Sequence, residues 1–455
     1  MTLSRRNLLQ GTLASFMAST MAPDAEAQQL QPASDSEAVP IIFVHGNGDH
    51  AALWMTTLWR FESNGFPRDR MMAFNFTDPV ARSNDSEPQP GRSSTDDQLR
   101  ELTAAIAVMR KRMSSARVAL VASSRGGYAV RNHVLGGGSS AISHVVLCGV
   151  PNHGVFISET NPASEFNGGG PFLQRLNAGA SEVVPDIQFL TLRSNGNDKF
   201  AQPDGRFIGR AGTPTGIDAD GPALRGATNL VLGDLDHREV AFHPRAFREI
   251  YKFITGREPG RIGISHEPDV ALSGLVTGFP AGVPSNRPLA GATVEIYRVS
   301  AETGERLGAP VHRRVTEADG QWGPARVEAG WFLEFVVEAP DHPVTHIYRS
   351  PFPRSSAVVH LRPGRPLGPD DVGAGSVVQM SRPRGYFGIP RDVVLLDGKE
   401  PKDVASGVPT DSVTTLRLPA SETGRPVVAL FNEERIVVRS WPAAENRITI
   451  AELTF

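Results

Sequence analysis

The stretch 118–127 (VALVASSRGG) runs from small and aliphatic residues straight into a turn that carries Ser124. A strand that bends abruptly into a helix needs tiny side chains beside the bend, because larger neighbours would collide. Ala122, Gly126 and Gly127 meet this demand in the pattern A-x-S-x-G. The pattern predicts that the Ser124 hydroxyl is held at the exposed tip of the turn, where it can act as a nucleophile. A small-residue turn without chemistry is the alternative interpretation.

A serine hydroxyl is a poor nucleophile unless a base takes its proton and an acid orients that base. Two later strand-like runs are each followed by such a residue: Asp198 comes after 187–193, and His237 comes after 229–233. Because the carboxyl ends of parallel strands meet at one edge of a sheet, we expect both side chains at the edge that carries Ser124. The competing acids and histidines are Asp204, Asp218, Asp220, His133, His144 and His243. The positions just after strands favour Asp198 and His237.

A tetrahedral intermediate on Ser124 would need two N–H donors for its oxyanion. The main-chain N–H of Arg125, the residue after the serine, is the first expected donor. The second is expected from the loop 45–50 (HGNGDH), where glycines let the backbone approach a substrate closely and Asn47 is the predicted donor. We expect His45 to brace this loop rather than to bind a metal, and we predict neither a metal nor a cofactor.

The pattern from residue 39 to 256 alternates short apolar runs with helix-like stretches. The runs predicted as buried strands are Val39–His45, Met72–Phe76, Val118–Ala122, His144–Val150, Ile187–Arg193 and Asn229–Gly233. Helices are predicted over 95–113, from Ser124 to the glycines at 136–138, and over 243–255. Thr95 and Gln98 fit a capping box at the start of the first of these helices. Strands that alternate with helices predict an α/β fold with a mostly parallel sheet.

The pattern after Gly256 becomes β-only, with runs of period two separated by turn residues. Residues 268–363 resemble a prealbumin-like β-sandwich, and 372–455 are predicted as a second β-rich domain. The segment 152–186 is a long insertion before a strand. It is predicted either as a cap over the site or as a plain packed excursion.

The composition excludes several classes of protein. The chain has 455 residues, a formal net charge of −3 and one cysteine, so we expect no nucleic-acid partner and no internal disulfide. Residues 1–27 combine Arg5-Arg6, a mildly apolar stretch and small residues at 25–27, as in a twin-arginine-type signal peptide. No other apolar run reaches the roughly 18 residues of a membrane span. We therefore expect a secreted or periplasmic protein without a transmembrane segment.

Several of these motifs together resemble bacterial lipases and esterases of the α/β-hydrolase superfamily. The motifs are Val44-His45-Gly46, Ala122–Gly126, Pro151–Gly154, the loop that carries Asp198, and Leu224–His237. The resemblance is to Bacillus-type lipases with an A-x-S-x-G turn, and to lipases with an added C-terminal β region. It implies an α/β-hydrolase domain over 39–256 that works without a cofactor. The implied roles are Ser124 as nucleophile, Asp198 as acid, His237 as base, and Asn47 and Arg125 as oxyanion donors.

The serine turn departs from the usual lipase pattern at Ser123 and Arg125. The long Arg125 side chain is predicted to lie near the pocket and to favour substrates with a carboxylate or another hydrogen-bond acceptor. The leading hypothesis is an exported serine hydrolase that cleaves carboxylic esters, as a triacylglycerol lipase or carboxylesterase, with the C-terminal β domains binding a lipid interface or only stabilising the chain. A polyester or oxidised-polymer depolymerase with the same residues, and a non-catalytic lipid- or carbohydrate-binding protein on a hydrolase scaffold, are the alternatives.

Overall fold

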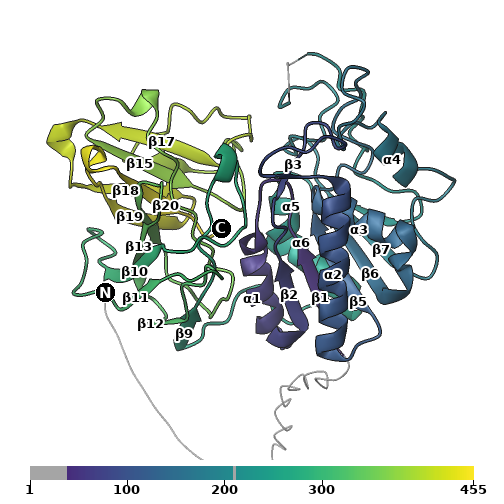
Figure 1. The fold of residues 1–455 in the computed structure, drawn as a ribbon, viewed down its shortest axis with the longest axis horizontal. Coiled ribbons are helices and arrows are strands. Elements are labelled where there is room, and N and C mark those ends of the chain that lie inside the picture. The colour runs from purple at the N-terminus through teal and green to yellow at the C-terminus, as the bar shows by residue number, and fades with distance from the viewer. Residues whose placement is uncertain (1–37, 209–211) are drawn as a thin grey trace, which may run out of the picture.

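The computed structural model describes residues 38–208 and 212–455 (Figure 1). The signal peptide predicted for 1–27 lies outside these residues. Within the described ranges, no helix has the length and apolar character needed to cross a bilayer.

The first half of the chain contains a six-stranded sheet in which every neighbouring pair is parallel, in the order β2-β1-β5-β6-β7-β8. The strands are β1 (Ile41–Val44), β2 (Met71–Phe74), β5 (Val118–Ser123), β6 (Ile142–Cys148), β7 (Gln188–Arg193) and β8 (Thr228–Val231). Each coincides with a run predicted from the sequence. The α/β fold class is therefore confirmed, because continuous apolar runs form strands that are covered on both faces.

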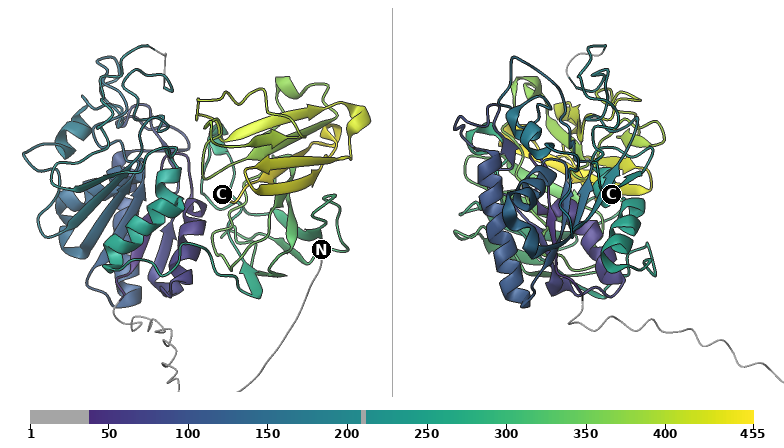
Figure 2. Two further views of the ribbon diagram at one scale, coloured as in Figure 1. Left: turned by 180° about the vertical axis from the view of Figure 1, so that it is seen from behind. Right: turned by 90° about the vertical axis from the view of Figure 1, so that its right-hand side faces the viewer.

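Helices cover both faces of this sheet (Figures 1 and 2). One face packs against α1 (Met55–Ser63), α5 (Glu239–Phe242) and α6 (Pro244–Thr255), and the other against α2 (Thr95–Met113), α3 (Gly126–His133) and α4 (Pro171–Leu176). The three predicted helices correspond to α2, α3 and α6. A short pair, β3 (Val80–Ala81) with β4 (Arg92–Ser93), lies beside the start of α2.

The capping box of α2 is displaced by one residue from its predicted position. Ser94 Oγ accepts a hydrogen bond from Asp97 N–H at 3.1 Å, and Asp97 Oδ2 accepts one from Ser94 N–H at 2.8 Å. Thr95 is the first helical residue, and its hydroxyl donates to Asp85 at 2.6 Å instead. The prediction of Thr95 and Gln98 as the capping box was wrong. Ser94 and Asp97 form the same pair of reciprocal hydrogen bonds one residue earlier.

The second half of the chain forms a seven-stranded sheet in the order β11-β10-β13-β14-β20-β15-β17. Its strands are β10 (Thr293–Val299), β11 (His312–Val315), β13 (Phe332–Glu338), β14 (Val344–Arg349), β15 (Ser376–Ser381), β17 (Val413–Leu418) and β20 (Arg447–Glu452). Two smaller sheets pack on it, made of β9 (Asp269–Leu272) with β12 (Ala325–Glu328), and of β16 (Val394–Leu396), β18 (Pro426–Phe431) and β19 (Glu434–Arg439). This half is called the β region below.

The β region is continuous across residues 364–371, which separate the two β segments predicted from the sequence. The last strand, β20, pairs in parallel with both β14 and β15, so segments 268–363 and 372–455 contribute to one sheet. The domain bounds drawn from the sequence remain a prediction. The local pattern did not reveal this pairing, because β14 and β20 lie about a hundred residues apart.

The β region also shares a hydrophobic core with the α/β half. Met55 and Trp59 of α1 are buried in a cluster that includes Phe352 and Leu361 of the β region. Trp59 Nε1 donates to the carbonyl of Ser355 at 2.9 Å. The two halves are therefore packed side by side along α1, as Figure 1 shows.

Candidate active site

Ser124 sits at a tight turn between β5 and α3. Its φ is +49°, a left-handed conformation that non-glycine residues rarely adopt. Its N–H donates to the carbonyl of Cys148 at 3.0 Å, which ties the turn to the neighbouring strand. A Cβ on Gly126 would lie 2.5 Å from the carbonyl oxygen of His45, and one on Gly127 would lie 2.3 Å from Val150. The turn therefore requires glycine at both positions, which is the steric reason for the sequence pattern.

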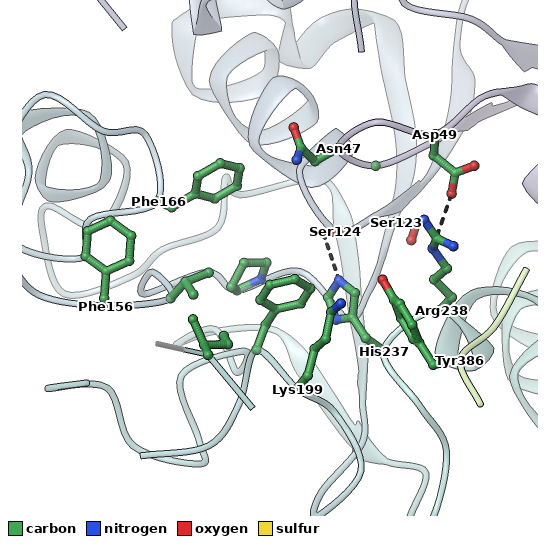
Figure 3. Close-up of a pocket in the computed structure, with 15 residues that line it drawn as sticks. Asn47, Asp49, Ser123, Ser124, Phe156, Phe166, Lys199, His237, Arg238 and Tyr386 are labelled. Atoms are coloured by element: carbon green, nitrogen blue, oxygen red, sulfur yellow. Dashed lines mark hydrogen bonds and ion pairs between the residues drawn. The ribbon is translucent and has the colours of Figure 1, made fainter. Parts of the chain in front are cut away.

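The structure brings Ser124, His237 and Asp198 together at the carboxyl edge of the sheet. Figure 3 shows Ser124 and His237 of this group. His237 Nε2 lies 2.9 Å from Ser124 Oγ, and His237 Nδ1 lies 2.9 Å from Asp198 Oδ1. Asp198 follows β7 and His237 follows β8, and both side chains are buried. This geometry can pass the serine proton to the imidazole while the carboxylate fixes the ring.

The competing residues lie elsewhere in the described structure. His133 contacts the hydroxyl of Thr103 at 3.0 Å, and His243 caps α6 by accepting from the N–H of Arg245. Asp220 pairs with Arg193 at the surface. His144 bonds its neighbour Ser143 within β6, and neither Asp204 nor Asp218 lines the cavity beside Ser124.

The main-chain N–H groups of Arg125 and Asn47 donate to no acceptor within the described part of the chain. The loop that carries Asn47 is held in place, because Asn47 Oδ1 accepts from Ala81 N–H at 2.8 Å and Gly48 N–H donates to Pro79 at 3.0 Å. Two unpaired N–H groups next to Ser124 are suited to stabilise a developing oxyanion. Their assignment as the oxyanion donors stays a prediction.

His45 braces the Asn47 loop, as the sequence predicted. Its Nδ1 lies 2.9 Å from the Gly46 carbonyl, and its Nε2 accepts from Phe76 N–H at 3.1 Å. Burial lowers the pKa of His45 to about 4, so the ring is neutral and can accept that hydrogen bond. Among the described residues, no group of three or more histidine, cysteine or acidic side chains is arranged to hold a metal ion.

The side chain of Arg125 does not face the cavity, contrary to the sequence-based expectation. It is fully buried and forms a two-pronged ion pair with Glu165, in which Nη2 lies 2.8 Å from Oε2. It also donates to Pro79 and to Ser93 at 3.0 Å each. The prediction that Arg125 selects a substrate carboxylate was wrong, because the guanidinium finds its carboxylate inside the protein. Arg125 instead anchors the inserted segment 152–186 to the serine turn.

The cavity beside Ser124 has a volume of about 380 Å³. Its walls come from three parts of the chain: the sheet edge with Ser124 and His237, the inserted segment, and the β region, which supplies Tyr386. The full lining is Gly46, Asn47, Asp49, Ser123, Ser124, Pro151, Val155, Phe156, Phe166, Lys199, Phe200, Ile208, His237, Arg238 and Tyr386. The segment 152–186 thus covers part of the site, whereas its mobility remains a prediction.

The β region also forms hydrogen bonds to the loop that carries His237 and holds it in place. Arg382 donates to Asp236 Oδ2 at 2.9 Å and to Glu239 Oε1 at 2.6 Å, and all three side chains are buried. The N–H of Tyr386 donates to the same Asp236 oxygen at 2.8 Å. Burial, together with nearby Glu239, raises the pKa of Asp236 to about 6, which Arg382 opposes. The backbone around His237 is therefore positioned by an ion-pair network that spans both halves of the molecule.

Sequence reasoning missed Lys199, Arg238, Arg382 and Tyr386. Arg238 and Lys199 directly follow the predicted His237 and Asp198, so their positions next to the site were a usable signal. Arg382 and Tyr386 lie about 145 residues beyond His237 in an ordinary basic turn. No local pattern marks them, because their partners are close only in the folded chain.

Two protein-family models match separate parts of the chain. The class 2 lipase family matches residues 38–165, and the lipase C-terminal domain matches residues 268–366. Over these two segments the chain matches lipases, and it combines an α/β-hydrolase fold with an additional C-terminal β region. These findings support an ester hydrolase of the lipase and esterase type.

Comparison with solved structures finds lipases and esterases of low sequence identity. Lipase B of Aspergillus fumigatus is 15% identical, with 50% of this chain and 56% of that chain covered and a TM-score of 0.34. The lipase BlEst2 of Bacillus licheniformis in its propeptide form is 14% identical, with 90% of this chain and 94% of that chain covered and a TM-score of 0.36. A gene product of Listeria innocua is 16% identical over 50% of this chain and 97% of its own, with a TM-score of 0.36. No curated protein matches the chain.

The serine turn yields a stability prediction. Gly126→Ala places a methyl group against the His45 carbonyl, so we expect a loss of about 2 kcal/mol or more in the free energy of unfolding. Ester hydrolysis should fall with it, because the turn and the Asn47 loop must move apart. The matched control is Gly136→Ala, where an added Cβ meets nothing within 4 Å and the stability should change by less than about 1 kcal/mol. Equal unfolding midpoints in urea for the two variants would contradict this account.

The contacts of Arg382 with the His237 loop yield a second prediction. Arg382→Gln leaves the buried Asp236 carboxylate without its guanidinium and leaves Glu239 paired with Arg391 alone, which costs about 3–5 kcal/mol. In the protein that remains folded, kcat should fall more strongly than KM rises, because His237 loses its support, whereas Tyr386 is the one wall residue that Arg382 contacts among the described residues. The control is Arg417→Gln, which breaks a surface pair with Asp371 and should cost less than about 1 kcal/mol. A folded Arg382→Gln variant with an unchanged kcat would rule out the positioning role.

Proposed function

We propose that the chain hydrolyses carboxylic esters through an acyl-enzyme on Ser124. The observation that carries the proposal is the 2.9 Å distance from Ser124 Oγ to His237 Nε2, with Asp198 2.9 Å from the other ring nitrogen. A serine in reach of an oriented imidazole is the arrangement that acyl transfer needs. The unpaired N–H groups of Arg125 and Asn47 support the same reaction.

In the first half of the reaction, Ser124 Oγ attacks the ester carbonyl while His237 Nε2 takes the hydroxyl proton. Asp198 keeps Nδ1 protonated and stabilises the imidazolium. The carbonyl oxygen becomes an oxyanion that accepts hydrogen bonds from the N–H groups of Arg125 and Asn47. His237 then gives its proton to the leaving alcohol, and Ser124 remains acylated.

In the second half, a water molecule attacks the acyl-enzyme. His237 takes a proton from that water as the new oxygen–carbon bond forms, and the proton returns to Ser124 Oγ when the acid leaves. The same N–H groups stabilise the second oxyanion. The reaction therefore balances with water as the only co-reactant.

The size of the cavity favours short and medium acyl chains. A volume of about 380 Å³ lies at the lower end of the range for small-molecule sites, so it accommodates a compact ester better than a whole triacylglycerol. This supports carboxylesterase activity over triacylglycerol lipase activity. We also propose export by the twin-arginine route, supported by Arg5-Arg6 and the small residues at 25–27.

Labelling with a fluorophosphonate probe tests the nucleophile. The wild-type protein should be labelled at Ser124, whereas Ser124→Ala should escape labelling and lose about a thousandfold or more in kcat. The control is Ser86→Ala, an exposed serine that should keep both properties. A labelled Ser124→Ala variant, or an unlabelled wild type that hydrolyses no ester, would exclude the proposed mechanism.

A series of p-nitrophenyl esters tests the substrate size. We expect kcat/KM to peak at short or medium acyl chains and to decline once the chain exceeds the cavity. Rates should rise smoothly with substrate concentration, without a jump when the substrate forms an interface. A maximum at the longest chains, with such a jump, would instead assign the protein as a lipase.

A further inference from the structure

The cavity beside Ser124 has two chemically different sides (Figure 3). Phe156 and Phe166, from the inserted segment, line one side. Lys199 and Tyr386 line the other, near His237. An ester whose carbonyl lies at Ser124 would therefore place one part among aromatic rings and its other part before an ammonium and a phenol.

The Lys199 ammonium has donors to spare. Its Nζ donates to the carbonyl of Thr410 at 3.1 Å and lies 4.0 Å from the centre of the Tyr386 ring. An ammonium carries three N–H donors. Within the described ranges, no carboxylate oxygen lies within 4.0 Å of Lys199 Nζ, the distance limit for an ion pair. Its neighbours are therefore the Thr410 carbonyl and the ring faces of Tyr386 and Phe200, and none of these carries a negative charge.

Arg238, the other cation of the cavity wall, is differently placed. Its guanidinium lies 3.8 Å from Asp49 and donates to the carbonyl of Pro383 at 3.1 Å. The charge of Arg238 is thus compensated inside the protein by Asp49. Of the two cations, Lys199 is therefore the one available to form an ion pair with a ligand.

Tyr386 supplies a second donor. The residue is 7% exposed, lines the cavity, and its hydroxyl has no hydrogen-bond partner among the described residues. Two donors on one wall of the cavity suit a bound carboxylate, because its two oxygens can accept one hydrogen bond each.

We propose that Lys199 Nζ and the Tyr386 hydroxyl form a subsite that selects esters bearing a negatively charged oxygen group, above all a carboxylate. The inference rests on the proposed function and adds a substrate class to it. The apolar part of such an ester lies against Phe156 and Phe166, and its charged part lies against Lys199. The attraction is stronger at the partly buried Lys199 than it would be at a fully exposed lysine.

The charge of Lys199 depends on pH in a useful range. Burial, with Arg238 nearby, lowers the pKa of Lys199 to about 8, while Asp411, Asp236 and Asp198 raise it in part. The ammonium is charged below this pH and neutral above it. A preference for anionic esters should therefore be present at neutral pH and fade as the pH rises through about 8.

Matched pairs of esters test the subsite. One pair is p-nitrophenyl hexanoate against the p-nitrophenyl half-ester of adipate, with the charge on the acyl side; the other is butyl hexanoate against the hexanoate ester of γ-hydroxybutyrate, with the charge on the alcohol side. In at least one pair, the wild type should prefer the anionic ester by about tenfold or more in kcat/KM. Lys199→Met should abolish this preference, and Lys199→Arg should retain part of it.

The control is Lys111→Met, which removes an exposed lysine in the last turn of α2 and should keep the wild-type preference. In the wild type, the preference should fall between about pH 7 and pH 9, whereas Lys199→Met should show no such change. This pH profile decides the question even if Lys199→Met fails to fold. Tyr386→Phe should weaken the preference without removing it.

An equal preference in wild type and Lys199→Met would overturn the proposal, as would an equal loss of activity on both members of each pair. The second result would mean that Lys199 only ties the halves together through Thr410. Failure of the proposed function is separate: it would appear as a wild type that neither hydrolyses neutral esters nor is labelled at Ser124.

Discussion

The close approach of three chain segments around Ser124 is the constraint on which the rest of the site depends. Ser124 adopts a left-handed conformation, Gly126 packs its backbone against the carbonyl of His45, and a Cβ on Gly46 would lie 2.9 Å from that of Ser124. This contact places the end of β5, the start of α3 and the Asn47 loop within reach of one substrate atom. A larger side chain at Gly46 or Gly126 would separate the Ser124 hydroxyl from the N–H groups beside it.

The β region takes part in the site rather than being attached beside it. Arg382 holds the loop of His237 through two buried carboxylates, and Tyr386 forms part of the cavity wall. Such buried ion pairs contribute little net stability, but they fix one arrangement because breaking them leaves a charge in the interior. The His237 loop of one half and the Arg382–Tyr386 turn of the other are therefore a single structural unit.

Much of the fold could be predicted because local periodicity reports burial. The apolar runs of β1, β5 and β6 are continuous because both faces of that sheet are covered, and the stripe of α2 is visible at Leu102, Ile106 and Met109. The candidate residues Ser124, Asp198 and His237 could be proposed because each lies in the loop or turn that follows a strand. The cap of α2 was misplaced by one residue, since either Ser94 or Thr95 suits that position.

The sequence by itself determined where the strands and the sharp turn lie, because these depend on neighbours within a few residues. Only the tertiary structure decided where long side chains point and which distant segments meet. The Arg125 side chain points into the protein, away from the cavity. There it forms a buried ion pair with the carboxylate of Glu165, forty residues later in the chain. Likewise, β20 joins β14 and β15 in one sheet, and Tyr386 reaches the cavity of Ser124. These contacts depend on the packing of whole elements, which leaves no local pattern in the chain.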